Sequence, residues 1–413
     1  MKLLIKNIKQ LVQVESEPHG PIKGKRMQEL PSLENAWLLI EDALIGDYGF
    51  MDECPESADI VLNAEDKMVF PCWCDSHTHI VYAGTREQEF VDRIQGMSYQ
   101  EIAKKGGGIL NSAKKLNDIS EDELIAQSLP RLNEIMMMGT GAVEIKSGYG
   151  LTVEGELKIL RAIKKLKSLS PLTIKATFLG AHAVPEKYKG NRDGYINLII
   201  NEMLPIIKED RLAEFIDVFC DKGFFTPEET DLILGAGVEI GLTPKVHANE
   251  LGFTGGVQAG VKHEAVSVDH LEHLGANEIN SLIKSSTIAT LLPSTAFYLG
   301  LKYAPARTLI NAGIPVAIAT DYNPGSSPSG NLPFVITLAC IQMKMTPEEA
   351  INAASINGAH AMEVQNELGS IAKGKKANVF ITKRIPSIAY FPYSFGSNLI
   401  ETVIINGKVQ TDG

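Results

Sequence analysis

Between about residues 68 and 364, short runs rich in β-branched residues alternate with longer stretches that have helical periodicity. In the longer stretches, such as VEGELKILRAIKKLK and TPEETDLILGAG, apolar residues lie three and four positions apart. Alternating strands and helices predict a parallel sheet, and eight such units predict that it closes into a TIM-like (β/α)8 barrel. The eight runs, in order, are VFPCWC, GAVEIKS, LTIKATFL, EFIDVFC, VEIGLTPKVHA, AVSVDHL, STIATLL and PVAIATD.

A doubly wound open sheet is the structural alternative to a closed barrel. In the dinucleotide-binding form of that fold, a GxGxxG turn follows the first strand and holds a phosphate. No such motif follows the first run of this sequence. The closed α/β barrel is therefore the preferred prediction.

The two ends of the chain have a different pattern. Residues 1–66 and 366–413 contain short strand-like segments separated by Gly, Asn, Pro and charged residues. Neither end has enough strands to bury a core by itself. We therefore expect both ends to pair into one small composite β-sandwich domain, and residues 67–365 to form the catalytic barrel domain.

Composition excludes several classes of protein. Of 413 residues, 44% are hydrophobic and 22% are charged, which excludes an intrinsically disordered chain. The formal net charge of −11 offers no basic face to a nucleic acid, and no apolar run reaches the roughly 18 residues of a membrane span. The start MKLLIKNIKQ lacks a signal-peptide core, and five cysteines fit reduced thiols. We expect a cytoplasmic protein that binds neither nucleic acid nor membrane.

Polar residues gather at the predicted strand ends, where the catalytic groups of a closed α/β barrel lie. Five of the nine histidines lie at such ends. A lone histidine in an apolar strand is usually a core residue, but five of them on one rim favour a functional site. With the acidic residues near them, they are His77, His79, His182, His247, Glu250, His270 and Asp321.

The first strand end carries an H-x-H motif that suggests a metal site. His77 and His79 are two positions apart, so on an extended strand both side chains point into the barrel. His247 and Asp321, at the ends of later strands, can complete a set of three imidazoles and one carboxylate. Such a set suits Zn²⁺ or Fe²⁺ and leaves room for a water molecule.

Two neighbouring features have simpler interpretations. Cys72 and Cys74 could suggest thiolate ligands, but their parity turns them away from the histidine pair and towards the helices, where thiols are inert. The glycines at 106–108 could suggest a phosphate-binding loop, but they do not directly follow a strand. We interpret them as a mobile loop.

Together these motifs resemble the amidohydrolase superfamily, whose members are metal-dependent barrel hydrolases with a small composite β domain. The shared features are H-x-H after the first strand, a later His followed three residues on by Glu, an Asp-His pair and a final Asp. The resemblance covers almost the whole chain and is closest to the branch that hydrolyses 4-imidazolone-5-propanoate in histidine degradation. It is carried by DSHTHIVYAGTREQEF, KSGYGLT, FLGAHAVP, VHANELG and ATDYNPGSSPSGNLP, of which KSGYG and TDYNPGSSP are the most specific.

The resemblance implies a role for each matching residue. It implies one Zn²⁺ or Fe ion per chain and a homodimer. The implied metal ligands are His77, His79, His247 and Asp321. The implied substrate contacts are Arg86, Tyr99, Tyr149, His182 and Glu250, with the turn residues Asn323, Gly325 and Ser326. One departure is Cys72, where the family usually has Gly, and we expect it to affect local packing rather than chemistry.

The implied reaction is hydrolysis of a ring amide C–N bond by a water molecule that the metal acidifies. Glu250 is expected to act as the general base, and His270 to polarise the carbonyl or to hydrogen-bond the hydroxide. His182 is expected to hold the ring. Arg86, assisted by two tyrosines, is expected to bind the propanoate of this small anionic imidazolone.

Three other functions compete with this interpretation. A cytosine- or guanine-type deaminase would share the metal set, but a neutral base needs no arginine. A binuclear hydrolase would need a carbamylated lysine near the end of the fourth strand, for which Lys222 is the candidate. A non-catalytic scaffold relative would have no reason to keep four ligands together with a base.

Overall fold

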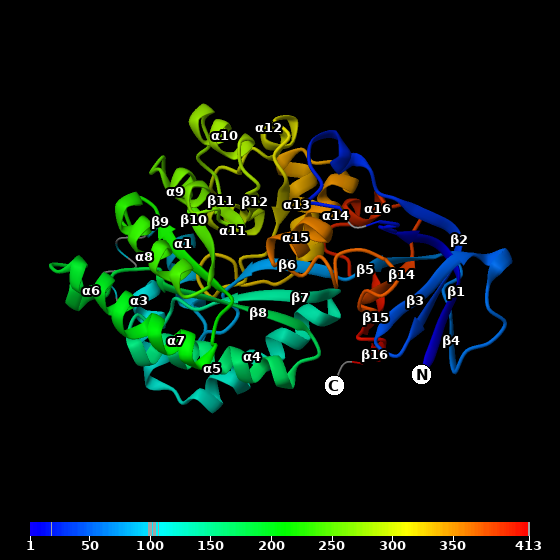
Figure 1. The fold of residues 1–413 in the computed structure, drawn as a ribbon, viewed down its shortest axis with the longest axis horizontal. Coiled ribbons are helices and arrows are strands. Elements are labelled where there is room, and N and C mark those ends of the chain that lie inside the picture. Colours follow the sequence, from blue (N-terminus) through cyan, green and yellow to red (C-terminus); the bar gives the residue numbers. More distant parts are fainter. Residues whose placement is uncertain (18, 98–100, 102–104, 106, 412–413) are drawn as a thin grey trace.

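The computed structural model describes residues 1–17, 19–97, 101, 105 and 107–411, which form two sheets and a layer of helices (Figure 1). One sheet consists of eight parallel strands from the middle of the chain, and the other is built from both ends. The barrel strands follow each other around the sheet in chain order. They are β6 Trp73–Thr78, β7 Thr140–Lys146, β8 Thr173–Ala181, β9 Phe215–Cys220, β10 Thr243–Ala248, β11 Ser267–His270, β12 Ile288–Leu291 and β13 Val316–Ile318.

The barrel closes where its first strand meets the segment after its last strand. The backbone N–H of Asp321 donates to the carbonyl of His77 at 2.9 Å, and the N–H of His79 donates to the carbonyl of Tyr322 at 2.9 Å. Neighbouring barrel strands pair in parallel, as β10 and β11 do where His247 lies beside Asp269. The expected (β/α)8 barrel is confirmed.

Helices cover the outside of the barrel, and polar side chains start several of them. The side chains of Ser120, Thr226 and Thr346 each accept a hydrogen bond from the backbone N–H of a glutamate three residues later. The carboxylate of that glutamate accepts one in turn from the backbone N–H of the capping residue. The barrel helices are α1 Glu87–Ile94, α3 Ile109–Asp118, α4 Glu121–Met137, α5 Val153–Leu169, α6 Arg192–Leu198, α7 Leu204–Asp210, α8 Pro227–Glu239, α9 Gly256–Lys262, α10 Ala276–Ile283, α11 Pro293–Leu299, α12 Ala306–Asn311, α13 Leu332–Met343, α14 Pro347–Ala354 and α15 Ile356–Ala361. Among the described residues, no helix combines the length and the apolarity needed to cross a bilayer.

The second sheet joins both ends of the chain, as the sequence predicts. Its strand order is β16-β15-β14-β5-β1-β2-β3, with β4 beside β1. Figure 1 shows its blue N-terminal strands and red C-terminal strands side by side, next to one end of the barrel. The strands are β1 Lys2–Val12, β2 Ser32–Glu41, β3 Leu44–Phe50, β4 Ile60–Asn63, β5 Lys67–Pro71, β14 Val379–Arg384, β15 Ile400–Ile405 and β16 Lys408–Gln410, and the short helix α16 Tyr390–Tyr393 precedes β15.

The boundary between the two sheets differs from the one expected at residue 67. Lys67–Pro71 belongs to the terminal sheet, where Val69 pairs with Leu11 of β1 and Ile381 of β14. The first barrel strand begins only at Trp73. The run VFPCWC therefore spans two strands, and its unbroken apolar character hid the break because both halves are buried. The run VEIGLTPKVHA is also divided, but between a helix and a strand, since its first two residues end α8 and TPKVHA forms β10.

Cys72 lies at the junction of the two strands and packs against Gly141 of β7. A Cβ added to Gly141 would lie 2.5 Å from the Cβ of Cys72, closer than two such atoms can approach. Burial raises the pKa of the Cys72 thiol well above its ordinary value, so it is an inert thiol. Cys74 packs with Ala359 and Met362, on the helix side of the strand as predicted.

We predict that Gly141→Ala destabilises the protein and that Cys72→Gly restores much of the loss. Overpacking a well-filled core costs about 1–3 kcal/mol. Denaturant unfolding of both single variants and of the double variant gives the coupling free energy. Additive effects would show that the two side chains do not compete for one space.

Candidate active site

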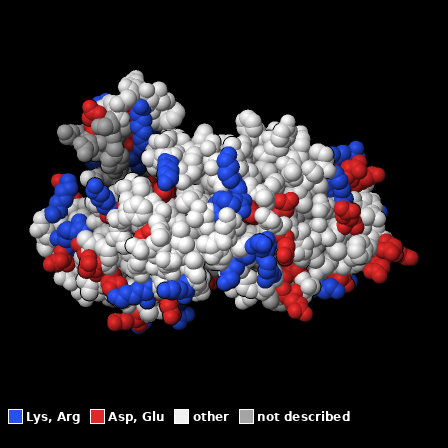
Figure 2. Space-filling model, turned by 90° about the horizontal axis from the view of Figure 1, so that it is seen from above, with Lys and Arg blue, Asp and Glu red and all other residues white. Residues whose placement is uncertain are grey.

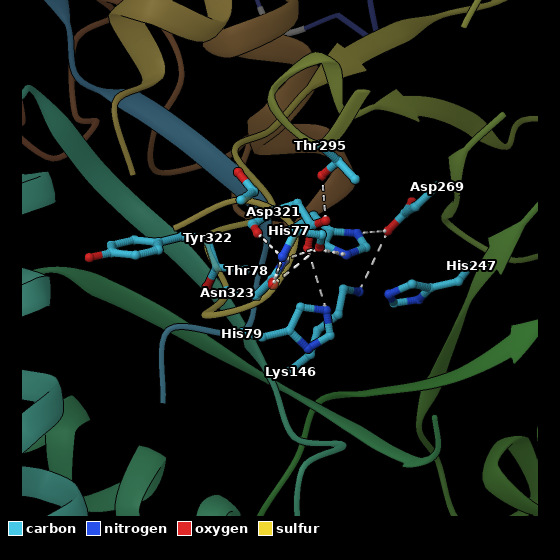
Figure 3. A network of polar contacts seen from close by, with 12 residues as sticks. His77, Thr78, His79, Lys146, His247, Asp269, Thr295, Asp321, Tyr322 and Asn323 are labelled. Atoms are coloured by element: carbon cyan, nitrogen blue, oxygen red, sulfur yellow. Dashed lines mark hydrogen bonds and ion pairs between the residues drawn. The ribbon is translucent and has the colours of Figure 1, made fainter. Parts of the chain in front are cut away.

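Four side chains from three parts of the barrel converge in its interior (Figure 3). His77 and His79 come from β6 and the residue after it, and His247 comes from β10. One ring nitrogen of each histidine lies within 4.8 Å of the other two. Asp321 follows β13, and its Oδ1 lies 3.6 Å from Nε2 of His77 and 3.7 Å from Nε2 of His79. The structure thus brings the four predicted ligands together.

The outer nitrogens of the histidines are held by other groups, so the inner nitrogens face one another. Nδ1 of His77 lies 2.6 Å from Oδ2 of Asp269, and Nδ1 of His247 lies 2.8 Å from Oδ2 of Asp217. A carboxylate only accepts, so both Nδ1 atoms carry the proton and both Nε2 atoms carry a lone pair. Those two Nε2 atoms are buried and have no hydrogen-bond partner in the described structure.

This donor set fits a metal ion. Burial, and then the nearby charge of Lys146, hold the pKa of His77 well below its ordinary value. Burial and the neighbouring His182 do the same to the pKa of His79. Both are therefore neutral imidazoles at pH 7, the form that binds metals. The fourth donor is also oriented, because the hydroxyl of Thr295 donates to Oδ2 of Asp321 at 2.6 Å.

Left-handed backbone conformations occur at several strand ends around the site. Asn249, His270, Leu271 and Asp321 have φ values of 57°, 84°, 68° and 53°. Such conformations cost about 1–3 kcal/mol each in residues other than glycine, and they persist where surrounding contacts impose them. At Leu271 the backbone N–H donates to the carbonyl of Ala248 at 3.1 Å, which ties β11 to β10.

Glu250 and His270 lie beside the predicted metal ligands and interact electrostatically with each other. Oε2 of Glu250 lies 3.8 Å from Nδ1 of His270, and Oε2 of Glu272 lies 3.8 Å from the same nitrogen. Burial, opposed by nearby His270, raises the pKa of Glu250 to about 7. Although burial opposes it, the carboxylates of Glu250 and Glu272 raise the pKa of His270 to about 10. Glu250 is thus poised to exchange a proton near neutral pH.

A cavity of about 610 Å³ opens over this centre. Its walls include every described residue that the sequence analysis assigned to the site except His77, which lies beneath it. Tyr99, also assigned to the site, lies outside the described residues. The predicted residues on the walls are His79, Arg86, Tyr149, His182, His247, Glu250, His270, Asp321, Asn323, Gly325 and Ser326.

Two arginines line the cavity next to Gly325: Arg86, which directly precedes α1, and Arg93 within α1. Nη2 of Arg86 is 2.6 Å from Oε2 of Glu89, and a Cβ added to Gly325 would lie 2.6 Å from Cζ of Arg86. Nη1 of Arg93 donates to the carbonyl of Gly325 at 2.9 Å. Only glycine at 325 leaves room for Arg86. Arg93 was missed in the sequence because it sits in an ordinary amphipathic helix.

The KSGYG segment contributes Tyr149 to the lining of the cavity. Oε1 of the buried Glu156 accepts from the backbone N–H groups of Gly150 and Leu151 at 2.7 and 2.9 Å, which shapes the loop around Tyr149. Nδ1 of His182 donates to the carbonyl of Gly148 at 3.0 Å. Burial lowers the pKa of His182 to about 3, so its Nε2 is an acceptor at neutral pH.

The segment after Asp321 forms a closed turn around Asn323. Oδ1 of Asn323 accepts from the N–H groups of Gly325 and Ser326, both at 2.8 Å, and its Nδ2 donates to the carbonyl of Asp321 at 2.7 Å. The side-chain amide of Asn323 therefore sets the shape of the wall. The hydroxyl of Ser326 lies beside it, with its oxygen 2.8 Å from Nδ2 of Asn323.

The residues that orient the histidines were not identified from the sequence. Asp217 and Asp269 lie inside apolar strands, and both are almost completely buried. Acidic residues at such positions are rarely buried without a partner, which was the available signal. Lys222, the candidate for a binuclear site, is exposed. It does not line the cavity over the four converging side chains.

Comparisons with known proteins agree with this geometry. The model of the amidohydrolase family matches residues 229–410. The imidazolonepropionase of Flavobacterium johnsoniae is 58% identical over 410 residues, which cover 99% of this chain and 100% of that protein. The imidazolonepropionase of Christiangramia forsetii is 55% identical with the same coverage. A crystal structure of an atrazine chlorohydrolase from Arthrobacter aurescens, complexed with zinc, has a TM-score of 0.71 at 16% identity and covers 98% of this chain and 94% of that one. At this identity, the likeness shows the fold alone.

We predict that Zn²⁺ raises the melting temperature of the metal-free protein. An ion that binds only the folded state adds about 2.7 kcal/mol of stability when its free concentration is 100 times its Kd. His79→Ala should remove most of the shift. His263→Ala is the control, because His263 pairs with Asp231 away from the cavity. An undiminished shift in His79→Ala would place the metal elsewhere.

Proposed function

The chain belongs to the imidazolonepropionase family of the amidohydrolase superfamily, and we propose that it hydrolyses 4-imidazolone-5-propanoate to N-formimidoyl-L-glutamate. The bond broken is a ring amide C–N bond. The observation that carries this proposal is the convergence of His77, His79, His247 and Asp321 beside Glu250 and below a cavity with two arginines.

The four converging side chains would hold one Zn²⁺ or Fe²⁺ ion per chain. Such an ion supplies Lewis acidity and lowers the pKa of water from 15.7 to about 7. The donors of the site do not distinguish the two metals, because three imidazoles and one carboxylate suit both. The homodimer expected from the family stays a prediction.

Glu250 is the group proposed to move the proton. With a pKa of about 7, it can take a proton from the attacking water and deliver it to the ring nitrogen that leaves. His270, which carries a positive charge between Glu250 and Glu272, can donate a hydrogen bond to the carbonyl oxygen as negative charge develops there. Glu272 would hold that imidazole in place.

The walls of the cavity fit a small anion with a polar ring. Lys and Arg side chains are interspersed with Asp and Glu among many uncharged residues on the face shown in Figure 2, so attraction for a carboxylate is expected to come from inside the cavity. Arg86 and Arg93 supply guanidinium groups on one wall. Nε2 of His182 can accept a ring N–H, and Tyr149 lies beside it with ring centroids 5.5 Å apart.

The same walls disfavour a cytosine- or guanine-type deaminase. A neutral base carries no negative charge to be attracted by the two arginines, whereas a propanoate can bind a guanidinium through two parallel hydrogen bonds. The direct test is to incubate the purified protein with 4-imidazolone-5-propanoate, cytosine and guanine in parallel. Formation of N-formimidoyl-L-glutamate supports the proposal, and deamination of either base without it would overturn it.

We predict that Glu250→Gln lowers kcat by at least about 100-fold and leaves the metal content unchanged. General acid–base catalysis contributes about 10²- to 10⁴-fold, and the amide keeps the size of the side chain but not its basic oxygen. Glu239→Gln, on the exposed end of α8, is the matched control and should keep full activity. A metal-replete Glu250→Gln with more than a tenth of the wild-type kcat would refute the role.

We predict that Arg86→Ala raises KM by about 10- to 100-fold with a much smaller change in kcat. A hydrogen bond to a charged group contributes about 1.5–3 kcal/mol, and a carboxylate remote from the breaking bond is bound equally in the ground and transition states. Gly325→Ala should also raise KM, because the added Cβ displaces the Arg86 guanidinium. Arg384→Ala, in an exposed ion pair with Asp66, is the control. An unchanged KM in Arg86→Ala would place the propanoate elsewhere.

A further inference from the structure

Lys146, the first residue of the KSGYG segment, lies below the metal ligands and has no role in the mechanism above. Its side chain is fully buried. Nζ lies 2.6 Å from Oε1 of Glu144, 2.8 Å from Oδ2 of Asp217 and 3.5 Å from Oδ2 of Asp269. These carboxylates come from β7, β9 and β11, so one ammonium group connects three strands across the barrel interior.

Two of these three carboxylates are the ones that orient metal ligands. The Oδ2 atom of Asp217 that contacts Lys146 also accepts from Nδ1 of His247. The Oδ2 atom of Asp269 that faces Lys146 also accepts from Nδ1 of His77 (Figure 3). Each link thus runs from the ammonium, through a single oxygen atom, to a ligand histidine. The other oxygens are fixed by the backbone N–H of His247 at 3.0 Å and by the hydroxyl of Ser267 at 2.6 Å.

The Lys146 ammonium stabilises the two neighbouring carboxylates of Asp217 and Asp269. Two carboxylates buried next to each other repel strongly, because little solvent screens them. The ammonium between them offsets that repulsion and also fixes the separation of their Oδ2 atoms. Since those atoms fix the planes of the two imidazoles, the distance between the two inner Nε2 atoms depends on Lys146.

We propose that Lys146 is a positioning residue that joins Asp217 and Asp269 and thereby holds His77 and His247 in the geometry that binds the metal. This inference rests on the proposed metal site and deepens it. Groups that hydrogen-bond the outer nitrogens of metal-bound histidines contribute about 10- to 100-fold to metal affinity. Lys146 acts on two such groups at once.

Lys245 provides an internal comparison. It is equally buried and pairs with Oε2 of Glu144, and its other hydrogen bonds go to the carbonyls of Ser76 at 3.1 Å and Ala361 at 3.2 Å. Within the described part of the chain, Nζ of Lys245 makes no ion pair or hydrogen bond with the carboxylate of Asp217 or Asp269. Loss of Lys245 therefore removes a buried ammonium of the same kind without touching the carboxylates that orient the histidines.

The experiment uses two matched double variants, Lys146→Met with Glu144→Gln and Lys245→Met with Glu144→Gln. Each loses one ammonium and one carboxylate, so the net charge of the cluster stays as in the wild type and neither leaves Glu144 as an unpaired charge. Zn²⁺ affinity is measured on the metal-free proteins by competition with a chelating dye. The ring ¹⁵N shifts of the metal-free proteins report which nitrogen of His77 and His247 carries the proton.

We expect the Lys146 double variant to bind Zn²⁺ at least about 10-fold more weakly than the wild type, with mixed tautomers at His77 and His247. The Zn²⁺ affinity of the Lys245 double variant should stay within about 3-fold of the wild-type affinity, a smaller change than the loss of one orienting group causes. Its His77 and His247 should keep the Nδ1–H tautomers. Equal losses in both variants, or no loss in either, would overturn the proposal. The proposal would also be overturned if the Lys146 double variant failed to fold while the Lys245 double variant folded, because Lys146 would then be needed for the stability of the barrel. A wild type that binds no Zn²⁺ would instead refute the metal site itself.

Discussion

Two backbone hydrogen bonds join the first barrel strand to the segment after the last one, and the site depends on them. They run from Asp321 N–H to the carbonyl of His77 and from His79 N–H to the carbonyl of Tyr322. Without this closure the parallel sheet would have two open edges, and Asp321 would lie far from the H-x-H motif. The same contact that completes the barrel therefore places the carboxylate beside two of the imidazoles.

Closure alone would not orient the histidines, and for that the barrel buries charge. Below the site, Glu144, Asp217, Asp269, Lys146 and Lys245 are all fully or almost fully buried. Removing one partner from a buried ion pair typically costs about 3–5 kcal/mol, so such a cluster makes the interior costly to alter. In return, it presents carboxylate oxygens to the outer nitrogens of His77 and His247 and leaves the inner nitrogens available. Burial also holds the pKa of His77 well below its ordinary value, so that imidazole is neutral.

The cavity above the site shows how local and overall charge can differ. The chain carries a net charge of −11, yet the proposed substrate is an anion. Charges farther away than about 8 Å are largely screened at physiological salt, so the two arginines on the wall matter more than the sum over the surface. Arg86 approaches the backbone of Gly325 closely, and Arg93 binds the carbonyl of the same residue. The wall that would hold the carboxylate is therefore built around a residue without a side chain.

Much of this arrangement could be predicted from the sequence, because it depends on local periodicity. Alternation of strands and helices predicted the barrel, and the two-residue spacing of His77 and His79 put both on its inner side. The places of His247 and Asp321 at later strand ends offered the remaining ligands, and the resemblance to a known superfamily implied the same two. Other features depend on contacts between residues far apart in the chain. The pairing of Lys67–Pro71 with β1 and β14, the links from Asp217 and Asp269 to the histidines, and the bridge formed by Lys146 are of this kind. A periodic pattern reports which face of an element is buried, but it does not report which partner lies across the interior. That partner is set by the register and closure of the barrel, which only the tertiary structure decides.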